Sequence, residues 1–276
     1  LTALPLFVWM GEILFRTKLS ENLFKGLAPW MQKLPGGLIH VNVVGCALFA
    51  AISGSSAATV ATVGKMSIPE LRKRKYPEKI LLGSLAGSGT LGLLIPPSII
   101  LIIYGVTVQE SIAKLFIAGI IPGIMIALIF MSYVIVWSTI NKKIMPQSLE
   151  SYSFIEKVKK SKQLMPIILL ILSVIGSIYT GVATATEAAS LGVVGALILS
   201  YFQKSLNKET FQASLLGATK TSCMIAFILA GATFLSLAMG FTGLPRNLAI
   251  WIQGMELSPY VLIFVLMIFY IILGMF

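Results

Sequence analysis

The chain has 276 residues, of which 57% are hydrophobic and only 11% are charged, and its formal net charge is +11. About a quarter of the residues of a soluble domain are usually charged, and the mean hydropathy here is +0.93, so this composition excludes an ordinary soluble protein. Nearly all Lys and Arg lie in four short linkers, at residues 16–33, 65–79, 141–162 and 204–220. This distribution is typical of the cytoplasmic face of a membrane protein and argues against nucleic-acid binding.

Several apolar segments approach the roughly 20 residues that a membrane-spanning helix needs. In chain order, we expect a partial span at residues 1–15, spans at 80–106, 115–137, 164–180 and 221–242, and a second partial span at 258–276. Because the two outer spans are incomplete, we expect the chain to be a fragment. The predicted fold class is an all-α, polytopic membrane helix bundle, located in a bacterial inner membrane.

Three apolar segments are interrupted by residues that end helices. Residues 34–67 are interrupted by Ser-Gly-Ser-Ser at 53–56, and residues 164–203 by a hydroxyl-rich stretch at 181–187. Residues 80–106 are broken by two adjacent prolines, which remove backbone donors and end the helix sterically. Lipid does not satisfy the freed carbonyls, so such a break lies inside protein or beside water. We therefore predict two re-entrant helical hairpins and one broken helix.

The two predicted hairpins resemble each other in sequence. Residues 56–64 (SAATVATVG) and 187–195 (EAASLGVVG) are identical at four of nine positions. Each hairpin follows a basic linker and precedes another hydrophobic segment. Paired interrupted segments in two halves of a chain are a sequence indication of a secondary transporter's binding site.

The interruptions supply the candidate binding residues. At a hairpin tip, the carbonyl groups that end one helix meet the N–H groups that begin the next. Carbonyls and hydroxyls are hard oxygen ligands that suit Na⁺, and the N–H groups suit a carboxylate. The candidates are Ser53, Gly54, Ser55, Ser56 and Thr59 in the first hairpin, Ser88, Thr90, Gly92, Ile95, Pro96 and Pro97 in the broken helix, and Thr184, Thr186 and Glu187 in the second hairpin. The predicted side-chain ligands of sodium are Ser53, Ser55, Thr184 and Thr186.

Each candidate also has a structural alternative. Ser and Thr in membrane helices often bond only to their own backbone or to a neighbouring helix, and residues 184–187 (TATE) match the capping box that begins many helices. Glu187 lies between long apolar runs, however, and an intramembrane carboxylate is a functional candidate. For Glu187 we favour a capping role combined with some part in ion coupling.

The sequence does not indicate an enzyme. It contains no Asp, only two cysteines (Cys46 and Cys223) and a single histidine, His40. The glycine-rich phosphate-binding loop of ATP-hydrolysing proteins and the HExxH motif of zinc proteases are both missing from the sequence. We predict no cofactor other than Na⁺ as the coupling ion.

Four stretches of the chain form a specific combination. They are residues 51–64 (AISGSSAATVATVG), 92–98 (GLLIPPS), 115–123 (LFIAGIIPG) and 184–189 (TATEAA). In this order they resemble the first hairpin, the broken helix, the helix after it and the second hairpin tip of the large membrane subunits of TRAP (tripartite ATP-independent periplasmic) transporters. Ala185 replaces the proline that is usual in that tip.

This resemblance implies Na⁺-driven uptake of an organic anion such as a C4-dicarboxylate, a sialate or a sugar acid. It also implies a periplasmic substrate-binding protein, a small membrane subunit of the Q type, inverted repeats and an elevator mechanism. Inverted repeats place the two hairpins on opposite faces, whereas the segment count places all four basic linkers on one face.

The resulting domain prediction divides the chain between scaffold and transport segments. Residues 1–33 are expected to be a scaffold helix and arm, 34–106 the first transport repeat, 107–163 a scaffold helix and basic arm, 164–242 the second transport repeat, and 243–276 a loop and a truncated helix. Two other functions remain open. One is a stand-alone Na⁺- or H⁺-coupled anion symporter, and the other is a membrane scaffold that transports nothing.

Overall fold

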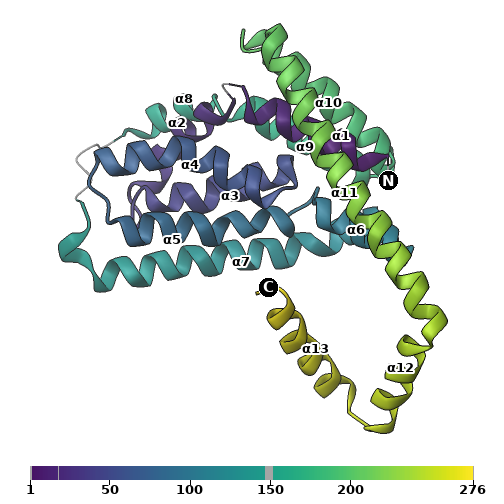
Figure 1. The fold of residues 1–276 in the computed structure, drawn as a ribbon. Coiled ribbons are helices and arrows are strands. Elements are labelled where there is room, and N and C mark those ends of the chain that lie inside the picture. Colours follow the sequence, from purple (N-terminus) through teal and green to yellow (C-terminus); the bar gives the residue numbers. More distant parts are fainter. Residues whose placement is uncertain (1, 18, 147–151, 276) are drawn as a thin grey trace. The chain divides into compact units, whose positions relative to one another are not determined.

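The regular structure is entirely helical in the residues that this computed structural model describes, which are 2–17, 19–146 and 152–275, and no strand occurs among them (Figure 1). The predicted all-α fold class is confirmed. The chain forms two units, Leu1–Ser222 and Cys223–Phe276. Residues 147–151 of the predicted third linker and residue 18 of the first linker lie outside the described residues. The same is true of residues 1 and 276, which belong to the predicted terminal spans.

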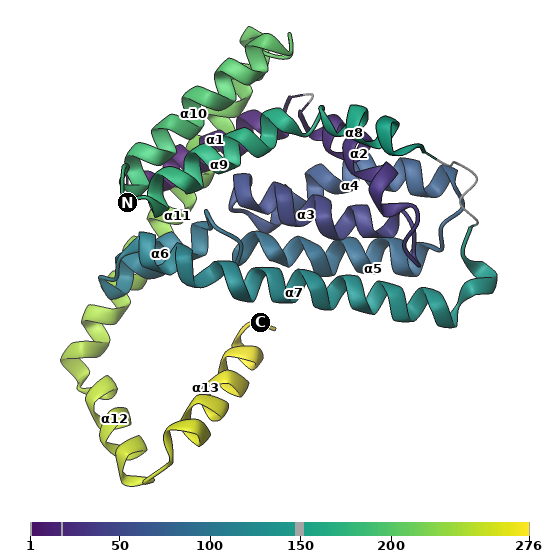
Figure 2. The same ribbon diagram turned by 180° about the vertical axis from the view of Figure 1, so that it is seen from behind.

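Four helices of the first unit lie side by side and form a bundle (Figures 1 and 2). They are α3 (Ile39–Ser53), α4 (Ser56–Lys73), α5 (Glu78–Gly89) and α7 (Ile112–Ile140). The helix α3 is central, because it contacts the other three and because 12 of its 15 residues are buried. An apolar helix that is covered on nearly all sides belongs in the interior of a bundle.

A second group of helices in the same unit consists of α1 (Ala3–Phe15), α9 (Met165–Tyr179) and α10 (Ala185–Phe202). The helix α1 lies along α10 and also contacts α3, so it joins this group to the bundle. The close approach of α1 to α10 depends on Gly192, where an added Cβ would collide with Met10 Sδ and lie 3.2 Å from Val174 Cγ2.

Two of the predicted basic linkers contain amphipathic helices, α2 (Leu19–Met31) and α8 (Phe154–Ser161), which pack on each other. Trp30 is at the centre of this contact. Its indole Nε1 donates a hydrogen bond of 2.7 Å to Ser161 Oγ, and its ring packs edge-on against Phe154 at 6.2 Å between centroids. Tryptophan with an apolar body and a polar tip is typical of membrane–water interfaces.

The broken helix is present where the sequence predicts it. The helix α5 continues into a short 3₁₀ turn, η1 (Thr90–Leu93), and the chain resumes a helix only at α6 (Ile99–Val108). The peptide bond between Pro96 and Pro97 is cis. Neither α5 nor α6 alone has the roughly 20 residues that cross a bilayer.

Three helices in the described part of the chain are long and apolar enough to cross a membrane: α7, α10 and α11 (Lys208–Thr242). The bent pair α8 and α9, with 56° between them, is a fourth candidate. The chain is therefore a multi-pass membrane protein. The span predicted at residues 164–180 corresponds to α9, which has only 15 residues. A membrane span needs roughly 20 residues.

Two linker predictions were wrong about where helices begin and end. Residues 208–220, predicted as a linker, are the first turns of α11, because Asn207 Oδ1 accepts a 2.6 Å hydrogen bond from Thr210 N and begins the helix. Residues 65–73, also predicted as a linker, continue α4, whose last turn is held by the fully buried Leu71. At 35 residues, α11 is about 52 Å long and so exceeds the hydrocarbon core.

The second unit contains the rest of α11 together with α12 (Leu244–Gly254) and α13 (Pro259–Leu273). No residue of α12 or α13 is buried, although α13 is almost wholly apolar. Because an apolar helix of this kind is stable only under cover, we expect lipid or further protein to surround it.

Enlarging Gly192 tests the packing of α1 on α10. We expect Gly192→Leu to destabilise the protein by about 1–3 kcal/mol, because overpacking a tight contact costs that much. A lowered midpoint of thermal unfolding in detergent would show it. The control is Gly176→Leu on α9, since a Cβ there meets nothing within 4 Å. Equal midpoints for the two variants would contradict the packing.

Candidate ion and substrate site

The tip of the first hairpin is a two-residue connection between α3 and α4. Gly54 has φ +60 and ψ 9, the left-handed conformation that ends α3, and Ser55 is extended and begins α4. Ser55 Oγ accepts a hydrogen bond from Ala58 N at 3.4 Å. The tip therefore brings the carbonyl end of one helix and the N–H end of another to the same place.

This tip packs backbone against backbone on the broken helix. Gly54 O accepts a 3.1 Å hydrogen bond from Ile99 N, the first residue of α6. A Cβ on Gly54 would lie 2.5 Å from Pro97 O, and a Cβ on Gly92 would lie 2.8 Å from Ser55 C and O. Only glycine fits at either position, so the two predicted interruptions form one structural unit.

Two further helices close around this unit. On α7, a Cβ at Gly119 would lie 2.8 Å from Leu94 O in the break. On α1, a Cβ at Gly11 would lie 3.0 Å from the Cα of Ser53. The helix ends exposed by the two interruptions are thus enclosed by protein, as the membrane environment requires.

Two hydroxyls lie buried inside the tip. The side chains of Ser53 and Thr59 are 2% and 0% exposed, and their oxygens are 2.9 Å apart. Thr59 Oγ1 donates to Ser55 O at 2.7 Å. A hydroxyl has one proton and two lone pairs, so a hydroxyl that donates to the backbone still has lone pairs for a cation. The tip therefore gathers two hydroxyls suited to a hard ion, whereas the Ser55 carbonyl already accepts hydrogen bonds from Thr59 N at 3.0 Å and from Thr59 Oγ1.

The other candidates of the first half have different surroundings. Ser88 Oγ donates to Ser84 O at 2.5 Å, and Thr90 Oγ1 donates to Gly87 O at 2.7 Å. Both hydroxyls thus bond to their own helix, as Thr59 Oγ1 also does through Ser55 O, but neither has a contact like the one between the Thr59 and Ser53 hydroxyls. The remaining candidates lie at the tip or in the break: Ser56 and Ile95 are partly exposed, and Pro96 and Pro97 are buried.

The connection in the second predicted hairpin is longer than the one in the first. Five residues, 180–184, join α9 to α10. Thr184 and Glu187 form the predicted capping box, in which Thr184 N donates to Glu187 Oε2 at 2.8 Å and Glu187 N donates to Thr184 Oγ1 at 3.3 Å. Both side chains are exposed. The capping role of Glu187 is therefore present in the structure.

The two predicted tips do not meet. Thr186 Oγ1 lies 3.4 Å from Thr2 Oγ1 at the start of α1, whereas Ser53 lies against Gly11 of the same helix. Nine residues of helix separate these contacts, or about 14 Å. One ion with ligands at about 2.4 Å does not bridge both, so the four predicted sodium ligands form two separate sets.

Sequence reasoning missed one buried polar residue, Asn42. Its side-chain amide donates to Leu81 O at 3.1 Å and to Ser84 Oγ at 3.0 Å. These bonds join the first turn of α3 to α5. Its Oδ1 is buried without a partner among the described residues. The available signal was a single amide within an apolar run, since polar residues inside membrane segments are costly and therefore informative.

A polytopic membrane protein in which a hairpin tip fills a helix break has the architecture that secondary transporters use for their binding sites. The family model described as "Tripartite ATP-independent periplasmic transporter, DctM component" matches residues 1–276. The chain therefore belongs to the DctM component family of TRAP transporters, which are transport proteins and not enzymes.

Several curated relatives align with the whole chain. It is 32% identical to a C4-dicarboxylate TRAP transporter large permease protein DctM of Pseudomonas aeruginosa, and this alignment covers 100% of the chain and 64% of the relative. It is 32% identical to the sialic acid TRAP transporter large permease protein SiaM of Vibrio cholerae, with the same coverage. An ectoine/5-hydroxyectoine permease protein UehC of Ruegeria pomeroyi is 31% identical over 100% of the chain and 63% of the relative. The chain thus spans less than two thirds of these relatives.

Replacing Gly54 tests the contact between the tip and the break. We expect Gly54→Ala to destabilise the protein by about 2 kcal/mol or more, because alanine is strained at positive φ and its Cβ would collide with Pro97 O. Thermal unfolding in detergent measures the change. The control is Gly83→Ala on α5, where the Cβ meets nothing within 4 Å and alanine favours the helix. Equal stability of the two variants would contradict the contact.

Removing the cap of α10 tests the role of residues 184–187. We expect Thr184→Ala to destabilise the first turn of α10 by about 1 kcal/mol, visible as faster hydrogen exchange of the amides at 185–187. Thr219→Ala is the control, because that hydroxyl is exposed and bonds only to the carbonyl of Leu215 in its own helix. If the amides at 185–187 exchange at the same rate in Thr184→Ala as in the wild type, Thr184 does not cap α10.

Proposed function

We propose that this chain is the membrane core of a secondary transporter that moves an organic anion across the bacterial inner membrane, coupled to Na⁺ and supplied by a periplasmic substrate-binding protein. The observation that carries this proposal is the backbone packing of the first hairpin tip into the broken helix, at Gly54 and Gly92. Membership of the DctM family supports the same proposal, and the hydroxyls of Ser53 and Thr59 are buried beside this contact.

Coupling to Na⁺ rests on the chemistry of the tip. Ser53 and Thr59 supply two buried hydroxyl oxygens, which are 2.9 Å apart. No carboxylate takes part in these contacts, and a set of neutral oxygens suits a monovalent cation better than a divalent one. We therefore assign the ion to the first hairpin tip and assign Thr184 and Glu187 to capping, with Thr186 beside α1.

The substrate class follows from the relatives and the helix ends together. The relatives' names include C4-dicarboxylate, sialic acid and isethionate, and also ectoine. The N–H groups at the starts of α4 and α6 are anion-binding in character, and Ser55 and Ser98 begin these two helices. Isethionate is a sulfonate and the other compounds carry carboxylates, so these features support an organic-anion substrate, for which we favour a carboxylate.

The family suggests the partners and the mechanism. As a large permease component it would act with a small membrane subunit and a periplasmic binding protein. An elevator movement is the mechanism we propose, with the hairpin and the broken helix moving as one body, because their backbones are too closely packed at Gly54 and Gly92 to slide past each other.

Uptake into proteoliposomes tests the proposal. The full-length subunit and its small partner would be reconstituted with and without an inward Na⁺ gradient, and with and without the binding protein. We expect uptake of a carboxylate only when both are present. Uptake that needs Na⁺ but no binding protein would favour a stand-alone symporter. The absence of uptake under every condition would favour a membrane scaffold, and uptake indifferent to Na⁺ would overturn the coupling.

Removing the buried hydroxyls tests the ion assignment. We expect the double variant Ser53→Ala, Thr59→Val to raise the Na⁺ concentration for half-maximal uptake about thirtyfold, because each of the two lost oxygen ligands contributes about 1 kcal/mol. The control is Thr139→Val on α7, whose exposed hydroxyl bonds only to Val136 O. If both proteins show the wild-type Na⁺ dependence, the ion does not bind at this tip.

A further inference from the structure

A large cleft lies elsewhere in the first unit. Its volume is about 830 Å³. Among the described residues, six cationic side chains and one carboxylate, that of Glu70, contribute to its lining. The cations are Arg16, Lys25, Lys65, Arg74, Lys160 and Lys204. A cleft lined so strongly by one sign of charge concentrates ions of the opposite sign.

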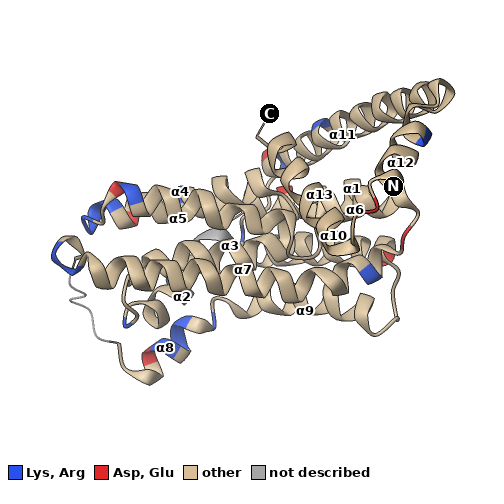
Figure 3. Cartoon of the chain, turned by 90° about the horizontal axis from the view of Figure 1, so that it is seen from below, with Lys and Arg blue, Asp and Glu red and all other residues tan. Residues whose placement is uncertain are grey.

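The cleft is where the four basic linkers of the sequence meet. Arg16 and Lys25 come from the first linker, Lys65 and Arg74 from the second, Lys160 from the third and Lys204 from the fourth. In Figure 3, Lys and Arg gather at the ends of α4 and α5 and along α8. Segments separated by more than 180 residues of sequence thus contribute positive charge to one place.

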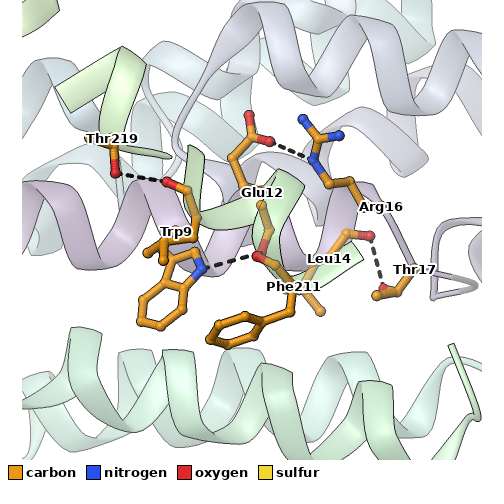
Figure 4. A network of polar contacts seen from close by, with 9 residues as sticks. Trp9, Glu12, Leu14, Arg16, Thr17, Phe211 and Thr219 are labelled. Atoms are coloured by element: carbon orange, nitrogen blue, oxygen red, sulfur yellow. Dashed lines mark hydrogen bonds and ion pairs between the residues drawn. The ribbon is translucent and has the colours of Figure 1, made fainter. Parts of the chain in front are cut away.

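Four of these six cations have no carboxylate partner among the described residues. Arg16 pairs with Glu12 at 3.0 Å (Figure 4), and Arg74 lies 3.8 Å from Glu70. Lys160 lies over the ring of Tyr152, 3.8 Å from its centroid. The remaining three, Lys25, Lys65 and Lys204, form no ion pair with the described residues. Like charges held together repel each other, so an anion bound among them would stabilise this arrangement.

Part of the remaining lining is apolar, beside polar residues such as Gln163 and Asn207. Phe15, Phe24 and Met66 contribute side chains, and Pro29 and Pro69 add further apolar surface. A cleft with both a cationic and an apolar wall suits a molecule that has both characters. A small hydrophilic anion would leave the apolar wall in contact with water, whereas an amphiphile would cover both walls.

The helix α10 indicates where the cleft lies relative to the membrane. This helix is long and apolar enough to cross a membrane, and its 18 residues span about 27 Å, close to the thickness of the hydrocarbon core. Lys204 and Ser205 come two and three residues after its last residue, Phe202, and line the cleft. The amphipathic helices α2 and α8, with Trp30 between them, supply two other walls. Taking α10 as a membrane span, we infer that the cleft lies at the level of the lipid headgroups.

We propose that this cleft binds the phosphate headgroup of an anionic phospholipid. Basic pockets between helices at the membrane surface recognise such headgroups. The phosphate would lie among Lys25, Lys65 and Lys204, and the adjoining acyl chains against the phenylalanines. Lys65 is ten residues beyond Ser55, about 15 Å along α4, so this site is separate from the hairpin tip.

A bound lipid would connect the hairpin to its surroundings. Lys65 and Arg74 belong to the second helix of the hairpin and the turn after it, whereas Lys25 and Lys160 belong to the amphipathic helices. The phosphate would neutralise charge on both sides and stabilise α4 beside α2 and α8. Binding of the lipid does not depend on which substrate is carried, nor on Na⁺.

Lipid binding to the purified full-length protein in detergent tests the proposal by native mass spectrometry. Phosphatidylglycerol would be compared with phosphatidylcholine of the same acyl chains, and we expect the anionic lipid to bind at least about tenfold more tightly. The triple variant Lys25→Gln, Lys65→Gln, Lys204→Gln should lose this preference. The control triple Lys33→Gln, Lys73→Gln, Lys79→Gln removes three exposed lysines that do not line the cleft and should keep it.

Two results would overturn the assignment. Equal binding of both lipids to the wild type, or an unchanged preference in the cleft variant, would show that the anionic headgroup is not held here. Inorganic phosphate is the third probe. If it displaces the lipid at low millimolar concentration, the cleft is a site for free phosphate and not for lipid. A matched thermal midpoint for the three proteins ensures that the comparison reports binding rather than unfolding.

Discussion

The first half of the protein depends on one steric constraint, the contact of two backbone interruptions at Gly54 and Gly92. Each glycine faces backbone atoms of the other segment at a distance that leaves no room for a side chain, and the hydrogen bond from Ile99 N to Gly54 O joins the segments. This contact satisfies groups that lipid would leave unpaired. It also places the buried hydroxyls of Ser53 and Thr59 where the end of α3 meets the starts of α4 and α6, which is where we propose that the ion binds.

The helix α1 relates this unit to the rest of the chain. Its Gly11 lies against the tip, its first turn lies beside Thr186, and its last residues reach the basic cleft through Arg16. A single short helix therefore contacts the proposed ion site, the start of α10 and the proposed lipid site. Any movement of the hairpin against α10 has to change contacts along α1.

The sequence predicted the features that depend on local chemistry. Adjacent prolines and the Ser-Gly-Ser-Ser stretch end helices wherever they occur, so the broken helix and the first tip were found, and the capping box at Thr184 follows from its spacing. Other features depend on which segments meet in space. The similarity between residues 56–64 and 187–195 suggested equivalent surroundings, yet Thr59 is buried and the aligned Ser190 is exposed. Periodicity also does not reveal that polar residues 208–220 continue a helix.

Direct binding of Na⁺ to the purified full-length protein, measured by calorimetry, is the most direct test of the central claim that the tip and the break together hold the ion. The decisive comparison is between the wild type and Gly92→Ala, which keeps every hydroxyl but places a Cβ 2.8 Å from the backbone of Ser55 and Ser56. Gly83→Ala serves as the control for adding a methyl group. We predict saturable binding of Na⁺ to the wild type and the control, and its loss in Gly92→Ala while helical content is retained. Binding of equal affinity in all three proteins would contradict the claim.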